Sequence, residues 1–124
     1  MARMLIADDH PVVRQRLKQL LLEGFPSAFL AVANDTESLV TLALSNEWDI
    51  IISDLAMPGG GGLHALKKIK QAKPSLLIII ISIYPEEQYA SHVISAGAAA
   101  FLNKNNADSE LVDTVKRLLE EVNK

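Results

Sequence analysis

Five short runs of apolar residues recur along this chain of 124 residues, and their spacing constrains the fold more than any other feature. No run alternates with polar residues, and uninterrupted runs of this kind are typical of β-strands that are buried on both faces. We therefore predict five buried strands, at residues 4–7, 29–32, 50–52, 76–81 and 98–102.

The segments between these runs have the apolar period of amphipathic helices. In the first segment, apolar residues follow Val13 at positions 17, 20 and 21, and a similar pattern runs from residue 111 to residue 122. Pro11 suits the first turn of a helix, and Asp35 suits a helix cap. Five strands that alternate with five helices through short connections predict right-handed βαβ units and one α/β domain with a parallel sheet.

The composition excludes several classes of function. The chain has 12 Lys and Arg against 15 Asp and Glu, a net charge of -3, which argues against nucleic-acid binding by bulk charge. It has no cysteine, and His10, His64 and His92 show no short ligand spacing, so we expect neither disulfides nor a histidine-rich metal site. No apolar run approaches the roughly 18 residues of a membrane span. We therefore expect a cytoplasmic protein that does not interact with a membrane.

Polar side chains follow four of the five predicted strands. Ligands of open parallel sheets bind beyond the carboxyl ends of the strands. Taken singly, each of these residues is more simply a turn residue, a helix cap or a solvated side chain. Together they place carboxylates, hydroxyls and an ammonium group at one edge of the sheet: Asp8, Asp9, Ser53, Asp54, Ser82 and Lys104.

Three carboxylates at one edge repel one another unless a cation lies between them. Mg²⁺ suits an all-oxygen set, because it prefers carboxylate and carbonyl ligands and keeps several waters. A magnesium ion with Lys104 opposite it would neutralise a phosphoryl group, and Asp54, at the end of the middle strand, is best placed to carry that group as an acyl phosphate. The residues therefore favour phosphoryl transfer to Asp54 with Mg²⁺ as the cofactor.

The motifs at these strand ends resemble those of two-component response-regulator receiver domains of the CheY-like superfamily. The matching segments are residues 5–11, 51–59 and 80–82, and residues 96–98 continuing through Phe101 to Lys104. They occur in the order and at the spacing of that family and cover the whole chain. The resemblance implies a doubly wound five-stranded parallel sheet of order 2-1-3-4-5 in a three-layer (βα)5 sandwich. Residues 1–124 would form one receiver domain.

Carried over position by position, the resemblance assigns the phosphoryl chemistry to Asp54. Asp54 would accept the phosphoryl group from the phosphohistidine of a sensor histidine kinase. Asp9 would bind Mg²⁺ directly and Asp8 largely through water, while Asp54 and the backbone carbonyl of Ala56 would complete the protein's ligands. Lys104 would pair with Asp54 before phosphorylation and with a phosphoryl oxygen afterwards.

Two further residues would respond to phosphorylation. The Ser82 hydroxyl would move toward the phosphoryl group, and Phe101 would turn inward to fill the space behind it, a packing change driven by a local charge. The resemblance implies a partner surface on the fourth helix, fifth strand and fifth helix, with Tyr84, Tyr89 and His92 in or near it. A homodimer promoted by phosphorylation is implied in the same way.

The Asp-His-Pro start and the stretch from Ser82 to Tyr89 are most similar to the NarL/LuxR-type subfamily. Members of that subfamily usually carry a C-terminal helix-turn-helix domain and regulate transcription. No such domain follows the fifth predicted helix here. We expect the receiver portion of a longer protein rather than a single-domain regulator, with DNA contacted only through the output domain.

The sequence departs from the family pattern in three places. Residues 59–62 are all glycine where the family usually has an aspartate before the last glycine, which predicts a loop of high conformational freedom. Asn105 follows Lys104 where many receivers have a cis-proline. Ile83 is bulkier than the residue common after Ser82, and we expect it to narrow access to Asp54 and slow the loss of the phosphoryl group.

Three other functions are weighed against this interpretation. A flavodoxin-like FMN carrier shares the fold, but residues 8–11 are acidic where an FMN phosphate would bind. An aspartyl phosphatase also uses Asp and Mg²⁺, but its motif is Asp-x-Asp, whereas Asp8 and Asp9 are adjacent. The strongest rival is a pseudo-receiver that acts only as a protein interaction module without phosphorylation. We expect a signalling domain and not an enzyme, apart from its own phosphoryl transfer and slow dephosphorylation.

Overall fold

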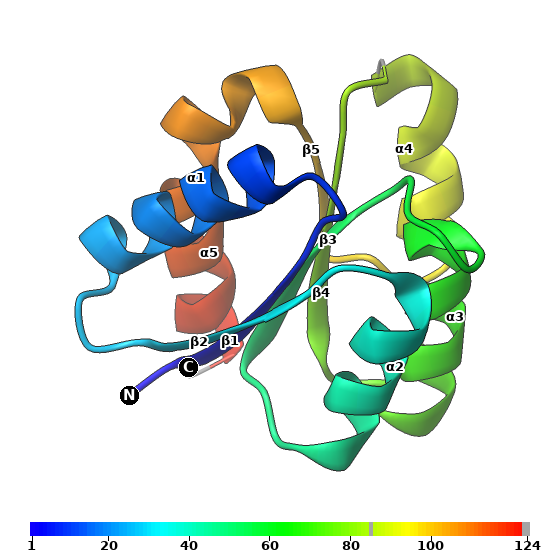
Figure 1. Cartoon of the computed structure of the whole chain (residues 1–124), viewed down its shortest axis with the longest axis horizontal. Helices are drawn as coiled ribbons and strands as arrows, with labels where there is room; N and C mark the ends of the chain where they lie inside the picture. The colour runs from blue at the N-terminus through cyan, green and yellow to red at the C-terminus, as the bar shows by residue number, and fades with distance from the viewer. Residues whose placement is uncertain (85, 123–124) are drawn as a thin grey trace.

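The computed structural model describes residues 1–84 and 86–122, and Pro85, in the stretch from Ser82 to Tyr89, lies outside the described residues. Strands and helices alternate along the whole chain (Figure 1). The elements are β1 (Arg3–Ala7), α1 (Pro11–Gly24), β2 (Phe29–Ala33), α2 (Thr36–Ser45), β3 (Ile50–Asp54), α3 (Gly61–Ala72), β4 (Leu77–Ser82), α4 (Glu86–Ser95), β5 (Ala100–Asn103), the 3-10 turn η1 (Lys104–Asn106) and α5 (Ala107–Val122).

The five strands form one parallel sheet in the order β2-β1-β3-β4-β5, which confirms the predicted flavodoxin-like topology. The register places Ala7 opposite Ser53 and Ser82 opposite Asn103. The residues that follow β1, β3, β4 and β5 therefore lie at one edge of the sheet.

Helices cover the sheet on both faces, so that the domain has three layers (Figure 1). α1 and α5 lie on one face, and α2, α3 and α4 lie on the other. Successive side chains of a strand point to opposite faces, and β3 shows this directly. Ile51 packs in the cluster formed with α2, α3 and α4, while Ile50 and Ile52 pack in the cluster formed with α1 and α5.

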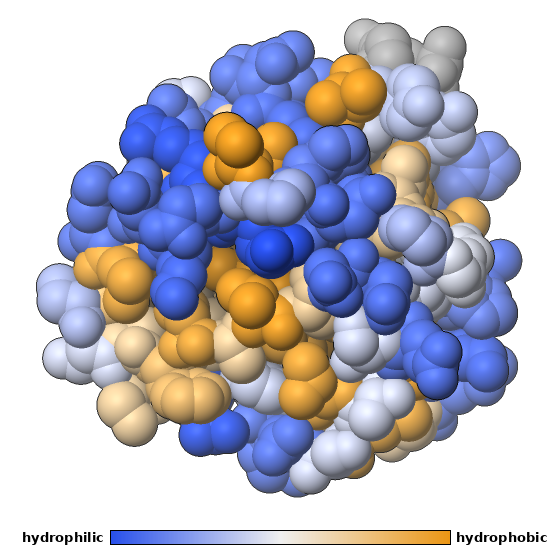
Figure 2. Space-filling model, in the orientation of Figure 1, coloured by the Kyte–Doolittle hydropathy of each residue, from blue (hydrophilic) through white to orange (hydrophobic). Residues whose placement is uncertain are grey.

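The prediction that all five strands are buried on both faces is wrong for β2. The side chains of Phe29 and Val32 are 43% and 42% exposed. β2 is an edge strand, so only one of its long sides is covered by a neighbouring strand. Figure 2 shows apolar side chains reaching the surface on the side of the molecule where β2 lies.

Helix starts follow the predicted signals. Asp35 caps α2, since its side chain accepts a hydrogen bond from the backbone N–H of Ser38 at 2.8 Å. Pro11 begins α1 behind His10, whose side chain makes no capping bond.

The glycine-rich segment differs from the free loop that we predicted. Gly61 and Gly62 are buried and form the first turn of α3, and Gly59 and Gly60 alone separate that helix from Pro58. Gly61 has a φ angle of +84°, in the region that favours glycine. The glycines therefore allow a specific close approach of the backbone beside β3.

Candidate functional site

The carboxylates of Asp8 and Asp54 lie side by side at the carboxyl edge of the sheet. β1 ends at Ala7 opposite Ser53, so Asp8 and Asp54 follow at the same level of two adjacent strands. Asp8 is completely buried, and Asp54 is 3% exposed. Two acidic side chains are thus held where water screens their charges poorly.

Lys104 neutralises part of this charge. Its Nζ atom lies 2.9 Å from Oδ2 of Asp8 and 3.0 Å from Oδ2 of Asp54. The lysine follows β5, which pairs with β4, so it reaches the two acidic residues across the carboxyl edge of the sheet. One ammonium group therefore bridges two buried carboxylates.

The pKa shifts of this group follow from burial and charge. Burial raises the pKa of the Asp54 carboxyl group, and the charge of Asp8 acts in the same direction, against the hydrogen bond from Lys104. Burial alone would lower the pKa of Lys104, but its hydrogen bonds and its attraction to Asp8 and Asp54 raise that pKa overall. Lys104 therefore stays charged at neutral pH, while ionised Asp54 is costly without a further cation.

His10 also points into this cluster. Its Nδ1 atom lies 3.0 Å from Oδ1 of Asp8, 3.0 Å from Oδ1 of Asp9 and 4.0 Å from Oδ2 of Asp54. The backbone N–H of His10 also donates a hydrogen bond of 2.8 Å to Oδ1 of Asp8. The spacing between histidines did not identify His10 as part of the site, because its neighbours in space are carboxylates.

The donor set fits a divalent cation. Asp8, Asp9, His10 and Asp54 each offer one ligand atom, and these atoms all lie within 4.8 Å of one another. Oδ2 of Asp8, although ion-paired with Lys104, and Oδ1 of Asp9 are buried and have no hydrogen-bond partner among the described residues. Buried polar atoms are normally satisfied, and a bound cation would satisfy the Asp9 oxygen, which lacks the ion pair that Asp8 has with Lys104.

A cavity of about 370 Å³ opens above Asp54. Ser82 lies in its wall at the end of β4, and the backbone N–H of Tyr84 donates a hydrogen bond of 2.9 Å to the Ser82 hydroxyl. The lining residues are His10, Val13, Asp54, Ala56, Ser82, Ile83, Tyr84 and Lys104. The predicted acceptor, lysine and hydroxyl thus share one cavity that is large enough for a phosphoryl group.

Three other residues singled out in the sequence differ in how closely they approach the Asp54 carboxylate. The backbone N–H of Ala56 donates a long hydrogen bond of 3.4 Å to Oδ1 of Asp54. Phe101 is buried in the core cluster on the α2, α3 and α4 face of the sheet. The Ser53 hydroxyl donates to the backbone carbonyl of Asp54 and does not line the cavity.

Thr36 is a second residue that the sequence analysis missed as part of the site. It is buried at the start of α2, where its Oγ1 accepts a hydrogen bond of 2.9 Å from the N–H of Gly61. Its own N–H donates to the carbonyl of Pro58 at 3.0 Å. Thr36 thus fixes both ends of the glycine segment, and its buried hydroxyl could not be recognised before its partner was known.

A Cβ atom on Gly62 would overlap the carbonyl oxygen of Asp54, so α3 begins in direct contact with the end of β3. This contact, together with the bonds of Thr36, holds the backbone on which Asp54 is displayed.

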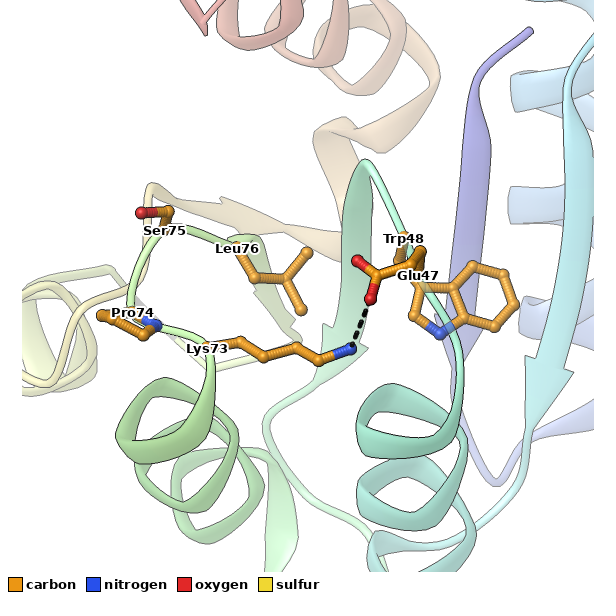
Figure 3. A pocket seen from close by; sticks show the side chains of 6 residues that line it. All are labelled: Glu47, Trp48, Lys73, Pro74, Ser75 and Leu76. Carbon is orange, nitrogen blue, oxygen red and sulfur yellow. Dashed lines mark ion pairs between the residues drawn. The ribbon is translucent and has the colours of Figure 1, made fainter.

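A second cavity of about 360 Å³ lies at the opposite edge of the sheet (Figure 3). Its one lysine, Lys73, donates hydrogen bonds to the carbonyls of Ala43 and Asn46 at the end of α2 and lies 4.0 Å from Glu47. Lys73 therefore caps a helix, and we do not assign the phosphoryl chemistry to this cavity. No helix among the described residues is long and apolar enough to cross a membrane.

A doubly wound sheet with an acidic cluster and a paired lysine at its carboxyl edge defines a class of phosphoacceptor signalling modules. The family model described as "Response regulator receiver domain" matches residues 4–116. The chain belongs to the response regulator receiver domain family, and its acidic cluster of Asp8, Asp9 and Asp54 is typical of a receiver magnesium site.

The relatives include regulators of the LuxR family. The chain is 34% identical over 115 residues to the oxygen regulatory protein NreC of Staphylococcus epidermidis, covering 92% of this chain and 53% of that protein. A LuxR-family response regulator from Aurantimonas sp. SI85-9A1 is 30% identical, with a TM-score of 0.89 over 98% of this chain and 86% of that one. The chain spans about half the length of the curated relatives it matches.

A third relative contains a cation. The response regulator TrrA of Thermotoga maritima, solved in complex with Mg(2+)-BeF, is 30% identical with a TM-score of 0.85. The match covers 95% of this chain and 99% of that one. Together these matches favour the receiver interpretation over the FMN carrier and the aspartyl phosphatase.

Proposed function

We propose that this domain is a phosphorylation switch in which Asp54 accepts a phosphoryl group from the phosphohistidine of a sensor histidine kinase. One observation carries the proposal: the Asp54 carboxylate is buried at the end of the central strand, paired with Lys104, inside a cluster of cation ligands. A carboxylate oxygen of Asp54 forms the new bond to phosphorus. The P–N bond to the donor imidazole breaks, and its electron pair stays on the imidazole nitrogen.

Asp8, Asp9, Asp54 and the backbone carbonyl of Ala56 would hold Mg²⁺. The bound ion supplies positive charge to the phosphoryl oxygens in the transition state. Lys104 supplies a second positive charge from the other side and needs no long movement, because it already contacts Asp54. Phosphoryl transfer depends mostly on such positioning and charge stabilisation.

The response to phosphorylation would pass through Ser82 and Phe101. The Ser82 hydroxyl accepts a bond from Tyr84, and a hydroxyl that accepts one bond can still donate its proton to a phosphoryl oxygen. A shift of Ser82 would move the segment that carries Tyr84, whose ring lies 5.4 Å from that of Tyr89 on α4. Ser82, Phe101 and these rings would thus change the surface formed by α4, β5 and α5.

The output would be the control of transcription through a DNA-binding domain, since LuxR-type regulators are among the relatives and the curated ones are about twice as long as this chain. A homodimer formed by the α4, β5 and α5 surface on phosphorylation would be the means of that control. The domain would act in the cytoplasm, where it would contact the kinase and where its output domain would bind DNA.

The test is incubation of the whole chain with Mg²⁺ and either acetyl phosphate or phosphoramidate, a donor with a P–N bond, followed by intact mass spectrometry. We expect one phosphoryl group on the native chain and none on Asp54→Asn. Asp113→Asn, which changes an exposed carboxylate on α5, is the matched control and should be labelled normally. An unlabelled native chain would support the pseudo-receiver, a module that binds partners without phosphorylation.

A further inference from the structure

His10 is the feature of the site that the receiver chemistry does not use. The imidazole lies at the mouth of the cavity above Asp54, and its Nδ1 atom faces inward toward three carboxylates. Imidazole nitrogen is a poor ligand for Mg²⁺ but a good one for Zn²⁺, Ni²⁺ and similar first-row transition ions. The ring therefore adds a different ligand type to an otherwise all-oxygen site.

The distances suit coordination by one shared ion. Two neighbouring ligands around an octahedral ion with bonds of about 2.1 Å are separated by about 3.0 Å, and two opposite ligands by about 4.2 Å. The Nδ1 atom lies 3.0 Å from oxygens of both Asp8 and Asp9, and 4.0 Å from an oxygen of Asp54. These separations match two neighbouring positions and one opposite position.

The backbone holds the ring in this place. His10 directly precedes Pro11, whose ring restricts the backbone at the start of α1, and the N–H of His10 bonds to Asp8. Arg14 adds a bond of 2.9 Å to the carbonyl of Asp8, which ties the first turn of α1 to the same loop. These contacts hold the His10 backbone, and a hydrogen bond of 3.0 Å between Nδ1 and Oδ1 of Asp8 orients the exposed ring.

One oxygen of Asp9 faces the imidazole without making a hydrogen bond. Oδ1 of Asp9 lies 3.0 Å from the His10 nitrogen and has no hydrogen-bond partner among the described residues, whereas Oδ2 of the completely buried Asp8 is ion-paired with Lys104. An ion in contact with Asp8, Asp9 and Asp54 would lie within reach of the imidazole as well, since all four ligand atoms fall within 4.8 Å.

We propose that His10 is a fourth protein ligand of this cation site and gives it a preference for imidazole-binding transition ions, such as Co²⁺, Ni²⁺ or Zn²⁺, over Mg²⁺. This proposal rests on the proposed function in one respect: both use the same acidic cluster as the cation site. A transition ion at this position would also supply the positive charge that phosphoryl transfer requires. The regulator would then respond to the metal that is present as well as to its kinase.

The test is direct metal binding by the chain without a histidine tag, measured by calorimetry for Mg²⁺ and by visible absorption for Co²⁺. We expect His10→Ala to weaken Co²⁺ binding at least about tenfold, as expected for the loss of a ligand, and to change Mg²⁺ binding less than about twofold. Mg²⁺ in excess should displace Co²⁺, which shows that both ions use one site. In the native chain, ring protons of His10 should show paramagnetic NMR shifts with Co²⁺.

Two controls separate coordination from other effects. His92→Ala, which removes an exposed histidine on α4, should leave Co²⁺ binding unchanged. His10→Asn keeps a polar side chain beside the carboxylates without the imidazole, and should keep Mg²⁺ binding but lose the preference for Co²⁺. The side chain of His10 makes no helix-capping bond, so neither variant removes a cap.

Equal Co²⁺ affinity in the native chain and His10→Ala would overturn the proposal. Tighter binding of both ions by His10→Ala would also overturn it, because His10 would then compete with the ion for the carboxylates. If the native chain is phosphorylated with Mg²⁺ but does not prefer Co²⁺, the metal proposal is contradicted and the phosphorylation switch is not. Co²⁺ bound through His10 in a chain that acetyl phosphate cannot label would contradict the phosphorylation switch and leave the metal assignment intact.

Discussion

The Nζ atom of Lys104 lies 3.0 Å from Oδ2 of Asp54, although the two residues come from the ends of different strands. The same atom contacts Asp8 at 2.9 Å, so the lysine lies between two buried carboxylates. Removal of one partner of a buried ion pair leaves an uncompensated buried charge. The stability lost in this way is larger than the net stability that the intact pair contributes. Lys104 therefore stabilises the pair of buried carboxylates.

Lys104→Ala should lower the free energy of unfolding by about 3 kcal/mol in the absence of divalent ions, because Asp8 and Asp54 lose their shared cation. Addition of Mg²⁺ should recover part of this loss. Urea denaturation with EDTA or with Mg²⁺ measures both effects. Arg16→Ala, which removes the exposed ion pair with Asp108, is the control and should change the stability far less, because solvent screens that pair. A similar small loss for Lys104→Ala would contradict the buried ion pair.

The stability of the metal-free domain should depend on the ionisation of Asp54. Burial raises the pKa of this carboxyl group above its ordinary value of 3.8, so the folded state binds more protons than the unfolded state between 3.8 and the raised pKa. The contribution of Asp54 to stability is therefore favourable at low pH and is lost as the pH rises through this window. The stability of Asp54→Asn relative to the native chain should increase over the same window. Denaturation in EDTA at a series of pH values measures this, and a constant difference would be inconsistent with the raised pKa.

Mg²⁺ should stabilise the folded domain, since the unfolded chain lacks the assembled carboxylates. At a concentration of about 100 times Kd, the increase in the free energy of unfolding should be about 2.7 kcal/mol. Asp9→Asn should lose most of this stabilisation, because it removes the charge of a carboxylate that lies in the cluster of ligand atoms. Thermal unfolding with and without Mg²⁺ measures the effect. Asp113→Asn should behave like the native chain, and a normal response of Asp9→Asn would remove Asp9 from the ligand set.

Gly62→Ala should destabilise the domain by about 3 kcal/mol, the upper part of the range for overpacking, because the added Cβ would overlap the Asp54 carbonyl. It should also slow phosphorylation by displacing the end of β3. The matched control is Gly60→Ala: its Cβ would meet only the side chain of His64, and its φ of +116° makes the cost about 1 to 2 kcal/mol. Chemical denaturation measures the free energy of unfolding of both variants. A larger loss for Gly60→Ala than for Gly62→Ala would contradict the close approach of α3 to β3.

Ile83→Ala should shorten the lifetime of phosphorylated Asp54. Ile83 lines the cavity beside Ser82 and is 64% exposed, so its side chain stands at the opening through which water reaches the acyl phosphate. The decay of the phosphorylated mass with time, after the donor is removed, measures this lifetime. Val12→Ala is the control, because it removes an exposed apolar side chain that does not line the cavity. Equal lifetimes in the native chain and Ile83→Ala would remove Ile83 from this role.

Local sequence patterns were sufficient to predict the order of the strands and helices and the edge of the sheet at which the polar cluster lies. Short apolar runs and helical periods depend on neighbouring residues, so β1, β3 and β4 were found within a few residues of their bounds. A parallel sheet brings the carboxyl ends of its strands together, and this rule alone placed Asp8, Asp54 and Lys104 near one another.

Which side chains contact one another could be known only from the packed structure. The exposure of β2, the bond between Thr36 and Gly61, and the approach of the His10 ring to Asp9 depend on how whole elements pack. The local pattern of β2 resembles that of a central strand, because apolar character does not reveal which strand lies at the edge of the sheet. Likewise, the direction of a single imidazole is set by contacts that form only when the strand ends and the first turn of α1 are assembled.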